Sequence, residues 1–143
     1  MSSEKLHYLW DLAPLEKETK VARFYEELKK GVLTTTKCKK CDKLLWPPRY
    51  ICPHCLSDSL EWVKLTGRGK IYAFTEIRHG LSAWMQRYAP KLAAIVELQE
   101  GFKIISWIEN SKFEDLKIGM KVQASHLEVS PDTVILTFVP VRA

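Results

Sequence analysis

The sequence of 143 residues lacks several features that would place it outside the reducing interior of a cell. It has no apolar run near the roughly 18–20 residues that cross a bilayer. Its first residues, MSSEKLHYLWDL, include acidic side chains and no long apolar stretch, so they are not typical of an export signal. All four cysteines lie between residues 38 and 55, which leaves no spare pair for a disulfide. We therefore expect a cytoplasmic protein.

Catalytic patterns are also missing. The four histidines are scattered at positions 7, 54, 79 and 126, and no serine lies in a nucleophile elbow. Every cysteine belongs to one motif, so none is available as a nucleophile. We therefore expect that the chain is not an enzyme by itself. Its net charge of +5 permits an anionic partner without selecting among nucleic acid, a phosphorylated cofactor and an acidic protein.

What the sequence does contain is a metal-binding pattern. Two C-x-x-C pairs, Cys38 to Cys41 and Cys52 to Cys55, are separated by ten residues. Each pair is typical of a knuckle, a tight turn that directs two thiolates at one ion, and two knuckles complete the four-sulfur tetrahedral shell that zinc prefers. A closed shell leaves no position for substrate. The spacing therefore predicts a structural zinc ion.

Two alternatives remain open for these cysteines. They could form two disulfides, although paired C-x-x-C knuckles are a metal pattern. They could also hold a single iron, as in rubredoxin-like electron carriers. The residue after each knuckle often has a left-handed backbone, which Asp42 tolerates and Leu56 tolerates poorly. Backbone N–H bonds to sulfur, which tune a redox centre, are then less assured, and this favours zinc.

Before the knuckles the sequence predicts helices. Apolar residues recur at i, i+3, i+4 and i+7 between residues 18 and 30, with charged residues opposite, and Gly31 ends the pattern. They are Val21, Phe24, Tyr25 and Leu28. A shorter apolar cluster between residues 6 and 12 precedes them. We predict that the helical face docks on a partner protein, although packing on the chain's own ribbon would produce the same pattern.

After the second knuckle the pattern changes to β-strands. The predicted strands cover residues 62–77, 92–98, 102–108, 122–129 and 134–139. Gly67 and Gly69 would bend the first. Five short strands with one buried face suit a nearly closed barrel of the OB type. The expected fold is therefore mainly β with N-terminal helices, divided into a helical segment (1–33), a zinc ribbon (34–61) and a five-stranded OB-fold barrel (62–143).

One long loop of the predicted barrel, residues 78–91, mixes aromatic and basic residues. The rings could stack on a base or an adenine ring while the cations lie near phosphates, which would make the loop a site for a nucleotide-like ligand. The candidates are Arg78, Trp84, Arg87, Tyr88 and Lys91. A short helix that caps the barrel with Leu81, Trp84, Met85 and Tyr88 is the alternative.

A further candidate for anion binding lies in the ribbon. Arg49 follows Pro47 and Pro48, whose fixed φ angles make a stiff, extended tether. A rigidly held arginine could contact an anion. A surface salt bridge is the other interpretation.

These motifs, in this order, resemble a known family. The order is an apolar helix, Cys38-Lys-Lys-Cys41, Trp46-Pro-Pro-Arg49, Cys52-Pro-His-Cys55, Gly67-Arg-Gly69 with Ile71-Tyr-Ala-Phe-Thr75, and Ala93-Ala-Ile-Val-Glu-Leu98 before Gly101. The sequence is similar, over roughly residues 21–139, to OB-fold proteins with an N-terminal rubredoxin-like zinc ribbon that are associated with acyl-CoA metabolism. Leu56 departs from the glycine that many relatives would have.

The resemblance implies a small non-catalytic subunit that binds a thiolase-like enzyme. In archaeal relatives such a subunit bridges acetoacetyl-CoA thiolase and hydroxymethylglutaryl-CoA synthase. It also implies acyl-CoA as a ligand, because the phosphates and adenine of coenzyme A suit a basic surface with aromatic rings. Its candidate contacts are then Arg49, Arg78, Trp84, Arg87, Tyr88 and Lys91. The rival hypothesis is a module that binds single-stranded nucleic acid, since zinc ribbons and OB barrels are both used for that purpose.

Overall fold

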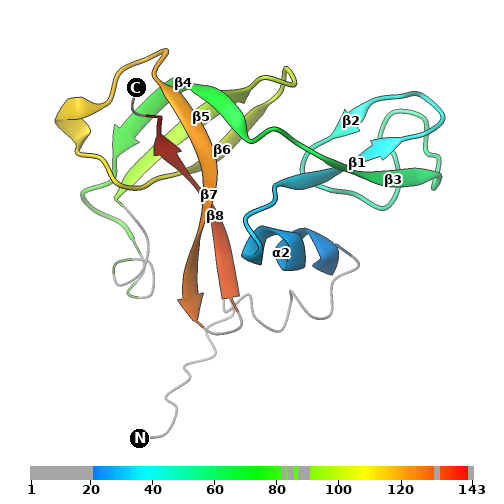
Figure 1. Ribbon diagram of the computed structural model, residues 1–143, viewed down its shortest axis with the longest axis horizontal. Helices are drawn as coiled ribbons and strands as arrows, with labels where there is room; N and C mark the ends of the chain where they lie inside the picture. The colour runs from blue at the N-terminus through cyan, green and yellow to red at the C-terminus, as the bar shows by residue number, and fades with distance from the viewer. Residues whose placement is uncertain (1–20, 82, 84–85, 87–90, 131–132, 142–143) are drawn as a thin grey trace, which may run out of the picture.

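The computed structural model describes residues 21–81, 83, 86, 91–130 and 133–141. Figure 1 shows two bodies, a small ribbon and a barrel, with one helix beside their junction. The elements are α2 (Ala22–Lys29), β1 (Thr34–Cys38), β2 (Leu44–Leu45), β3 (Leu60–Lys64), β4 (Arg68–Glu76), β5 (Leu92–Leu98), β6 (Lys103–Ile108), the 3-10 turn η1 (Phe113–Asp115), β7 (Lys121–Ser130) and β8 (Thr133–Pro140). None of the helices in these ranges is long and apolar enough to span a membrane.

Helix α2 confirms the predicted helical pattern between residues 18 and 30. Its apolar stripe turns Phe24 and Leu28 inward. At its end the Gly31 N–H donates to the Leu28 carbonyl at 2.9 Å and the Val32 N–H donates to the Glu27 carbonyl at 3.0 Å. These two bonds form a Schellman motif, with Gly31 in the left-handed region at φ +82°. The apolar cluster predicted between residues 6 and 12 lies outside the described residues.

The ribbon is a three-stranded antiparallel sheet in the order β2-β1-β3. Its own core is very small, because the buried residues on its metal side are only Cys38, Leu45 and Cys52. The buried Thr35 hydroxyl donates to the Leu45 carbonyl and joins β1 to the end of β2. A sheet of this size cannot be stabilised by burial alone.

The barrel is closed, with the strand order β4-β5-β6-β8-β7. All neighbouring strands are antiparallel except β6 and β8, whose parallel pairing at Trp107–Thr137 and Ile108–Phe138 completes the closure. Alternate residues of β5 point inward, as its buried residues Leu92, Ala94, Val96 and Leu98 show. The structure thus confirms the predicted class: a mainly β fold in which helix α2 and a ribbon precede a five-stranded OB barrel.

One predicted strand is in fact two. The sequence predicts a single bent strand from residue 62 to 77, but β3 pairs with β1 in the ribbon and β4 pairs with β5 and β7 in the barrel. Leu65 leaves the ribbon by donating its N–H to the Leu33 carbonyl at 2.9 Å. Gly67 then takes φ +71°, and a Cβ there would lie 2.9 Å from the Cβ of Ala124. The backbone therefore needs glycine where it changes sheets.

The ribbon and the barrel share a hydrophobic contact. The Trp46 ring lies 5.7 Å from the Phe24 ring of α2 and 5.9 Å from the Phe102 ring, which precedes β6. Trp46 and Phe102 are stacked with an interplanar angle of 24°. Because Trp46 follows β2, this row of rings connects the ribbon, the helix and the barrel.

Candidate metal centre and surrounding surfaces

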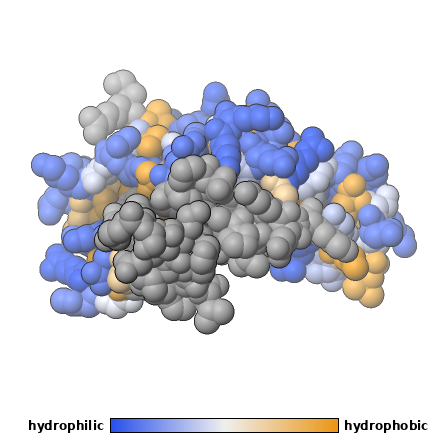
Figure 2. All heavy atoms as spheres, turned by 90° about the horizontal axis from the view of Figure 1, so that it is seen from below, coloured by the Kyte–Doolittle hydropathy of each residue, from blue (hydrophilic) through white to orange (hydrophobic). Residues whose placement is uncertain are grey.

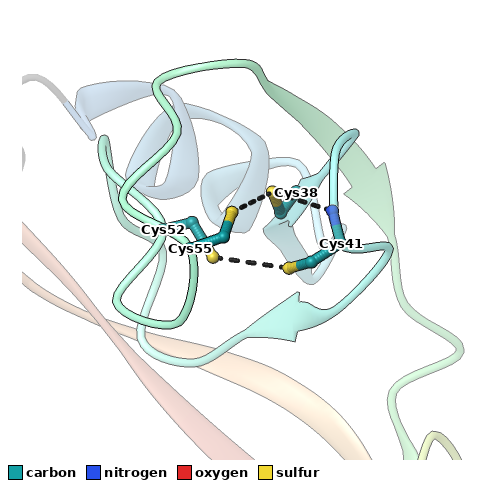
Figure 3. Close-up of side chains that lie close together, drawn as sticks. All are labelled: Cys38, Cys41, Cys52 and Cys55. Atoms are coloured by element: carbon teal, nitrogen blue, oxygen red, sulfur yellow. Dashed lines mark hydrogen bonds between the residues drawn. The ribbon is translucent and has the colours of Figure 1, made fainter.

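The four cysteines converge on one point. Cys38 and Cys41 come from the end of β1 and the turn after it, and Cys52 and Cys55 come from the loop between β2 and β3. Figure 3 shows their sulfurs directed toward one another. The four sulfur atoms all lie within 4.8 Å of one another.

The two knuckles have matching backbones. In the first, the Asp42 N–H donates to the Cys38 carbonyl at 2.9 Å, and in the second, the Leu56 N–H donates to the Cys52 carbonyl at 2.9 Å. The φ angles are +63° at Asp42 and +62° at Leu56. The left-handed backbone that is common after such knuckles is therefore present at both positions, including Leu56, where the sequence had left it open.

The sulfur spacing fits a zinc shell. The Cys38 and Cys55 sulfurs are 3.5 Å apart, and those of Cys41 and Cys52 are 3.6 Å apart. A tetrahedral ion with Zn–S bonds of about 2.3 Å would separate its sulfurs by about 3.8 Å. All four thiols are free, so the alternative of two disulfides is not what the structure adopts. The residues present fit a four-coordinate structural metal and leave no open position for a substrate.

Hydrogen bonds favour the thiolate form at two of the ligands. The Cys41 N–H, 3.4 Å from the Cys38 sulfur, lowers the pKa of Cys38. Burial by itself would raise the pKa of Cys52, but the backbone N–H groups of Cys55 and His54 outweigh it and lower that pKa to about 6. The backbone N–H groups of the knuckles therefore stabilise the thiolate form of Cys38 and Cys52.

The other two ligands show the opposite shift. The backbone at Lys43 acts to lower the pKa of Cys41, yet burial and the three nearby sulfurs raise it to about 11. The pKa of Cys55 is also raised, because burial and the nearby sulfurs of Cys38 and Cys52 exceed the lowering effect of the Ser57 backbone. Four thiolates cannot share this small volume without a cation. A divalent ion removes this conflict, so the electrostatics match a metal site.

The face of α2 that was predicted to dock on a partner protein packs largely against the chain's own core. Phe24 and Leu28 are buried in the core that also contains the barrel residues, and Val21 and Tyr25 are half-buried. The Tyr25 ring packs against the Phe24 ring at 5.1 Å. The two most buried residues of this face are thus unavailable to another protein, and the pattern marks internal packing between the helix, ribbon and barrel.

The predicted coenzyme A contacts do not form one cluster. Arg78 and Lys91 stand at the two ends of the barrel loop, on the opposite side of the molecule from the ribbon that carries Arg49 (Figure 1). The Arg78 guanidinium pairs with Glu76 at 3.2 Å. Trp84, Arg87 and Tyr88 lie outside the described residues.

Arg49 lines a hollow between the ribbon and the barrel. The hollow has a volume of about 270 Å³ and is lined by Leu44, Leu45, Trp46, Arg49, Pro53, His54, Phe102 and Lys103. We call it the ribbon–barrel hollow. The sequence did not single out Phe102 or Lys103, because only the fold brings the β5–β6 hairpin beside the residues that follow β2.

The Arg49 backbone is fixed on both sides by one threonine. Its N–H donates to the Thr36 hydroxyl at 2.9 Å, and that hydroxyl donates to the Arg49 carbonyl at 3.1 Å. Within the described part of the chain its guanidinium has no carboxylate partner, which differs from the salt bridge considered above. Arg49 is therefore a cation on a rigid support, with no carboxylate partner among the described residues.

Comparisons with known proteins match both the ribbon and the barrel to family models. Residues 26–61 match the family model described as "ChsH2, rubredoxin-like zinc ribbon domain", and residues 62–126 match "ChsH2, C-terminal OB-fold domain". The chain is 34% identical, over 82% of its length and 84% of the relative's, to a DUF35 domain-containing scaffold protein of Methanocaldococcus jannaschii. The chain belongs to the DUF35 family.

Two further relatives are named as parts of enzymes. One is the benzoylsuccinyl-CoA thiolase subunit BbsA of Geobacter metallireducens, which is 32% identical over 66% of each chain. The other is the solved structure titled "Ltp2-ChsH2(DUF35) aldolase", with a TM-score of 0.71, 29% identity, and coverage of 83% of this chain and 92% of that one. The zinc-ribbon match and the cysteine cluster together support structural zinc, as the sequence predicted.

Proposed function

We propose that this DUF35 chain is a non-catalytic accessory subunit of a thiolase-like enzyme. The observation that carries the proposal is its similarity, along most of its length, to a scaffold protein and to a named thiolase subunit. A closed four-sulfur metal shell supports it, because such a site stabilises a fold and offers no catalytic position. The proposal includes hydroxymethylglutaryl-CoA synthase as a second enzyme that the subunit contacts.

The finer part of the proposal concerns acyl-CoA. The ribbon–barrel hollow combines an aromatic wall, made by Trp46 and Phe102, with the guanidinium of Arg49, which has no carboxylate partner in the described part of the chain. An apolar wall suits the pantetheine arm, and a fixed cation suits a phosphate. We therefore place the acyl-CoA contact at this hollow and assign Arg49 to the phosphates.

Affinity purification from the native host tests the partner. The tagged chain is recovered at moderate salt after nuclease treatment, and the co-eluting proteins are identified by mass spectrometry. We expect a thiolase-like protein in stoichiometric amount. Recovery of the chain alone would reject the accessory role, and recovery with proteins that process nucleic acid would support the rival module.

Calorimetry tests the ligand. We expect Arg49→Ala to weaken coenzyme A binding to the assembled complex about tenfold, because a charge-assisted hydrogen bond is lost. Lys117→Ala is the matched control, since it removes an exposed cation outside the hollow. Equal affinity for the wild type and Arg49→Ala would remove Arg49 from the ligand site.

A further inference from the structure

The two zinc knuckles are matched in backbone but differ in the residue that closes them. Asp42 and Leu56 occupy equivalent positions with nearly the same left-handed φ. Aspartate is one of the side chains that tolerate this conformation, whereas leucine is not. The first knuckle therefore has a residue suited to its backbone, and the second does not.

The surroundings of Leu56 do not explain its presence. Asp42 is ion-paired with Lys37 at 3.0 Å. Leu56, in contrast, is 77% exposed, and the small ribbon core is filled without it by Cys38, Leu45 and Cys52. A large apolar side chain on an unfavourable backbone, facing water, contributes nothing visible to the folding of this chain.

Leu56 shares its loop with two other exposed apolar side chains. Tyr50 and Ile51, in the same loop, are 50% and 56% exposed. We call Tyr50, Ile51 and Leu56 the knuckle patch. Figure 2 shows apolar surface among hydrophilic residues at the ribbon end of the molecule. Exposed apolar patches with a polar rim are typical of protein–protein contacts.

The ribbon segment that carries the knuckle patch is basic. Residues 37–56 contain five lysines and arginines and a single carboxylate, that of Asp42. Lys39, Lys40 and Lys43 are exposed. This segment therefore holds most of the excess positive charge of the chain. A surface with an apolar centre and a cationic rim is complementary to an apolar socket bordered by aspartate and glutamate.

We propose that the knuckle patch is the surface through which this subunit docks on its thiolase-like partner, with Leu56 inserted into an apolar socket that has an acidic rim. This inference rests on the proposed function. It explains why a strained, exposed leucine occurs in a knuckle whose zinc ligands need only a turn: the metal holds the loop rigid, and the rigid loop presents the side chain without further loss of entropy on binding.

The deciding variant is Leu56→Gly. It removes the side chain and relieves the backbone, so the zinc ribbon should fold at least as well as in the wild type. Asp42→Gly is the matched control, because it makes the same backbone change in the other knuckle. Binding of each variant to the purified thiolase-like enzyme that co-elutes from the host is measured by biolayer interferometry, with zinc content checked in parallel.

We expect Leu56→Gly to weaken binding at least about tenfold with full zinc content, and Asp42→Gly to change it less than about twofold. Equal binding by Leu56→Gly and the wild type would overturn the docking surface while leaving the accessory role intact. Failure of the wild type to bind the enzyme would instead overturn the accessory role, and this inference with it.

Two additional measurements distinguish an acidic partner protein from a second copy of this chain as the occupant of the patch. A Lys39→Glu, Lys40→Glu double variant should slow association and reduce its dependence on salt, because the cationic rim steers an acidic partner. Sedimentation of the chain alone should show the same state for the wild type and Leu56→Gly. A wild-type dimer that Leu56→Gly converts to a monomer would assign the patch to a second copy and overturn the proposal.

Discussion

The ribbon and the barrel are both small β structures, yet different forces hold them together. The barrel closes around fully buried side chains such as Val96, Val134 and Phe138. On the metal side of the ribbon, two of the three buried residues are cysteine ligands. The barrel is therefore stabilised by apolar burial, and the ribbon depends on a metal ion. A rigid ribbon that needs no large core is free to expose apolar residues to a partner.

Removal of the metal should produce the largest difference in stability between the ribbon and the barrel. Zinc binding contributes about 10–16 kcal/mol in small zinc peptides, so its loss through Cys52→Ser or a chelator should unfold the ribbon. We expect hydrogen exchange to accelerate at the amides of β1 and β3 while those of β5 and β6 stay protected. His54→Ala is the control, because His54 lies between two ligands but outside the sulfur cluster.

The same preparation distinguishes the metals. A zinc protein is colourless, whereas a ferric thiolate site absorbs visible light. Retained protection of β1 in the metal-free protein would show that burial alone stabilises the ribbon, and loss of protection throughout the barrel would show that the two regions unfold together.

Truncation of the barrel core should have the second largest effect. Phe138 is fully buried, and Phe138→Ala should reduce the free energy of unfolding by about 3–5 kcal/mol, since it removes apolar contacts and leaves a cavity. Urea denaturation measures the change. Ile105→Ala, at a site that is 80% exposed, should cost less than about 0.5 kcal/mol. If folded Phe138→Ala lost its bound zinc, the stability of the ribbon would depend on the barrel core and not on the metal ion alone.

Features that depend on residues close together in the sequence were predictable. The spacing of the cysteines identified all four ligands, and the strand pattern identified the OB barrel, because ligand spacing and side-chain alternation are local properties. Neither prediction required knowledge of what the segment packs against. The left-handed backbone at Leu56 was left open by the sequence, because leucine tolerates that conformation poorly.

Features that depend on tertiary contacts were not predictable. The pattern around Phe24 correctly marked an apolar face, but it carried no information on whether the chain's own core or another protein covers that face. The strand over 62–77 was divided between two sheets because Leu65 pairs with Leu33, far away in sequence. The ribbon–barrel hollow needed Trp46 and Phe102 to meet, which no local pattern encodes.

The contact between the regions should make a smaller, measurable contribution. Trp46→Ala and Phe102→Ala each remove one partner of the stacked pair that joins the ribbon to the barrel. A double-mutant cycle, with the free energy of unfolding from urea denaturation, should give a coupling of about 0.5–1.5 kcal/mol. Trp46→Ala combined with Phe113→Ala is the control, because Phe113 packs on Phe74 elsewhere. A coupling near zero would mean that the rings are adjacent without mutual stabilisation.

The smallest predicted effect is the difference in stability between glycine variants of the two knuckles. Leu56→Gly should stabilise the zinc-bound ribbon by about 0.5–1 kcal/mol, because relief of the left-handed leucine exceeds the entropy that glycine adds to the unfolded chain. Asp42→Gly should be neutral or slightly destabilising, since aspartate tolerates the backbone and its exposed ion pair with Lys37 is lost. Thermal unfolding at fixed zinc concentration measures both. If Leu56→Gly proved destabilising, the leucine would have a structural role, and its exposure would no longer require a partner to explain it.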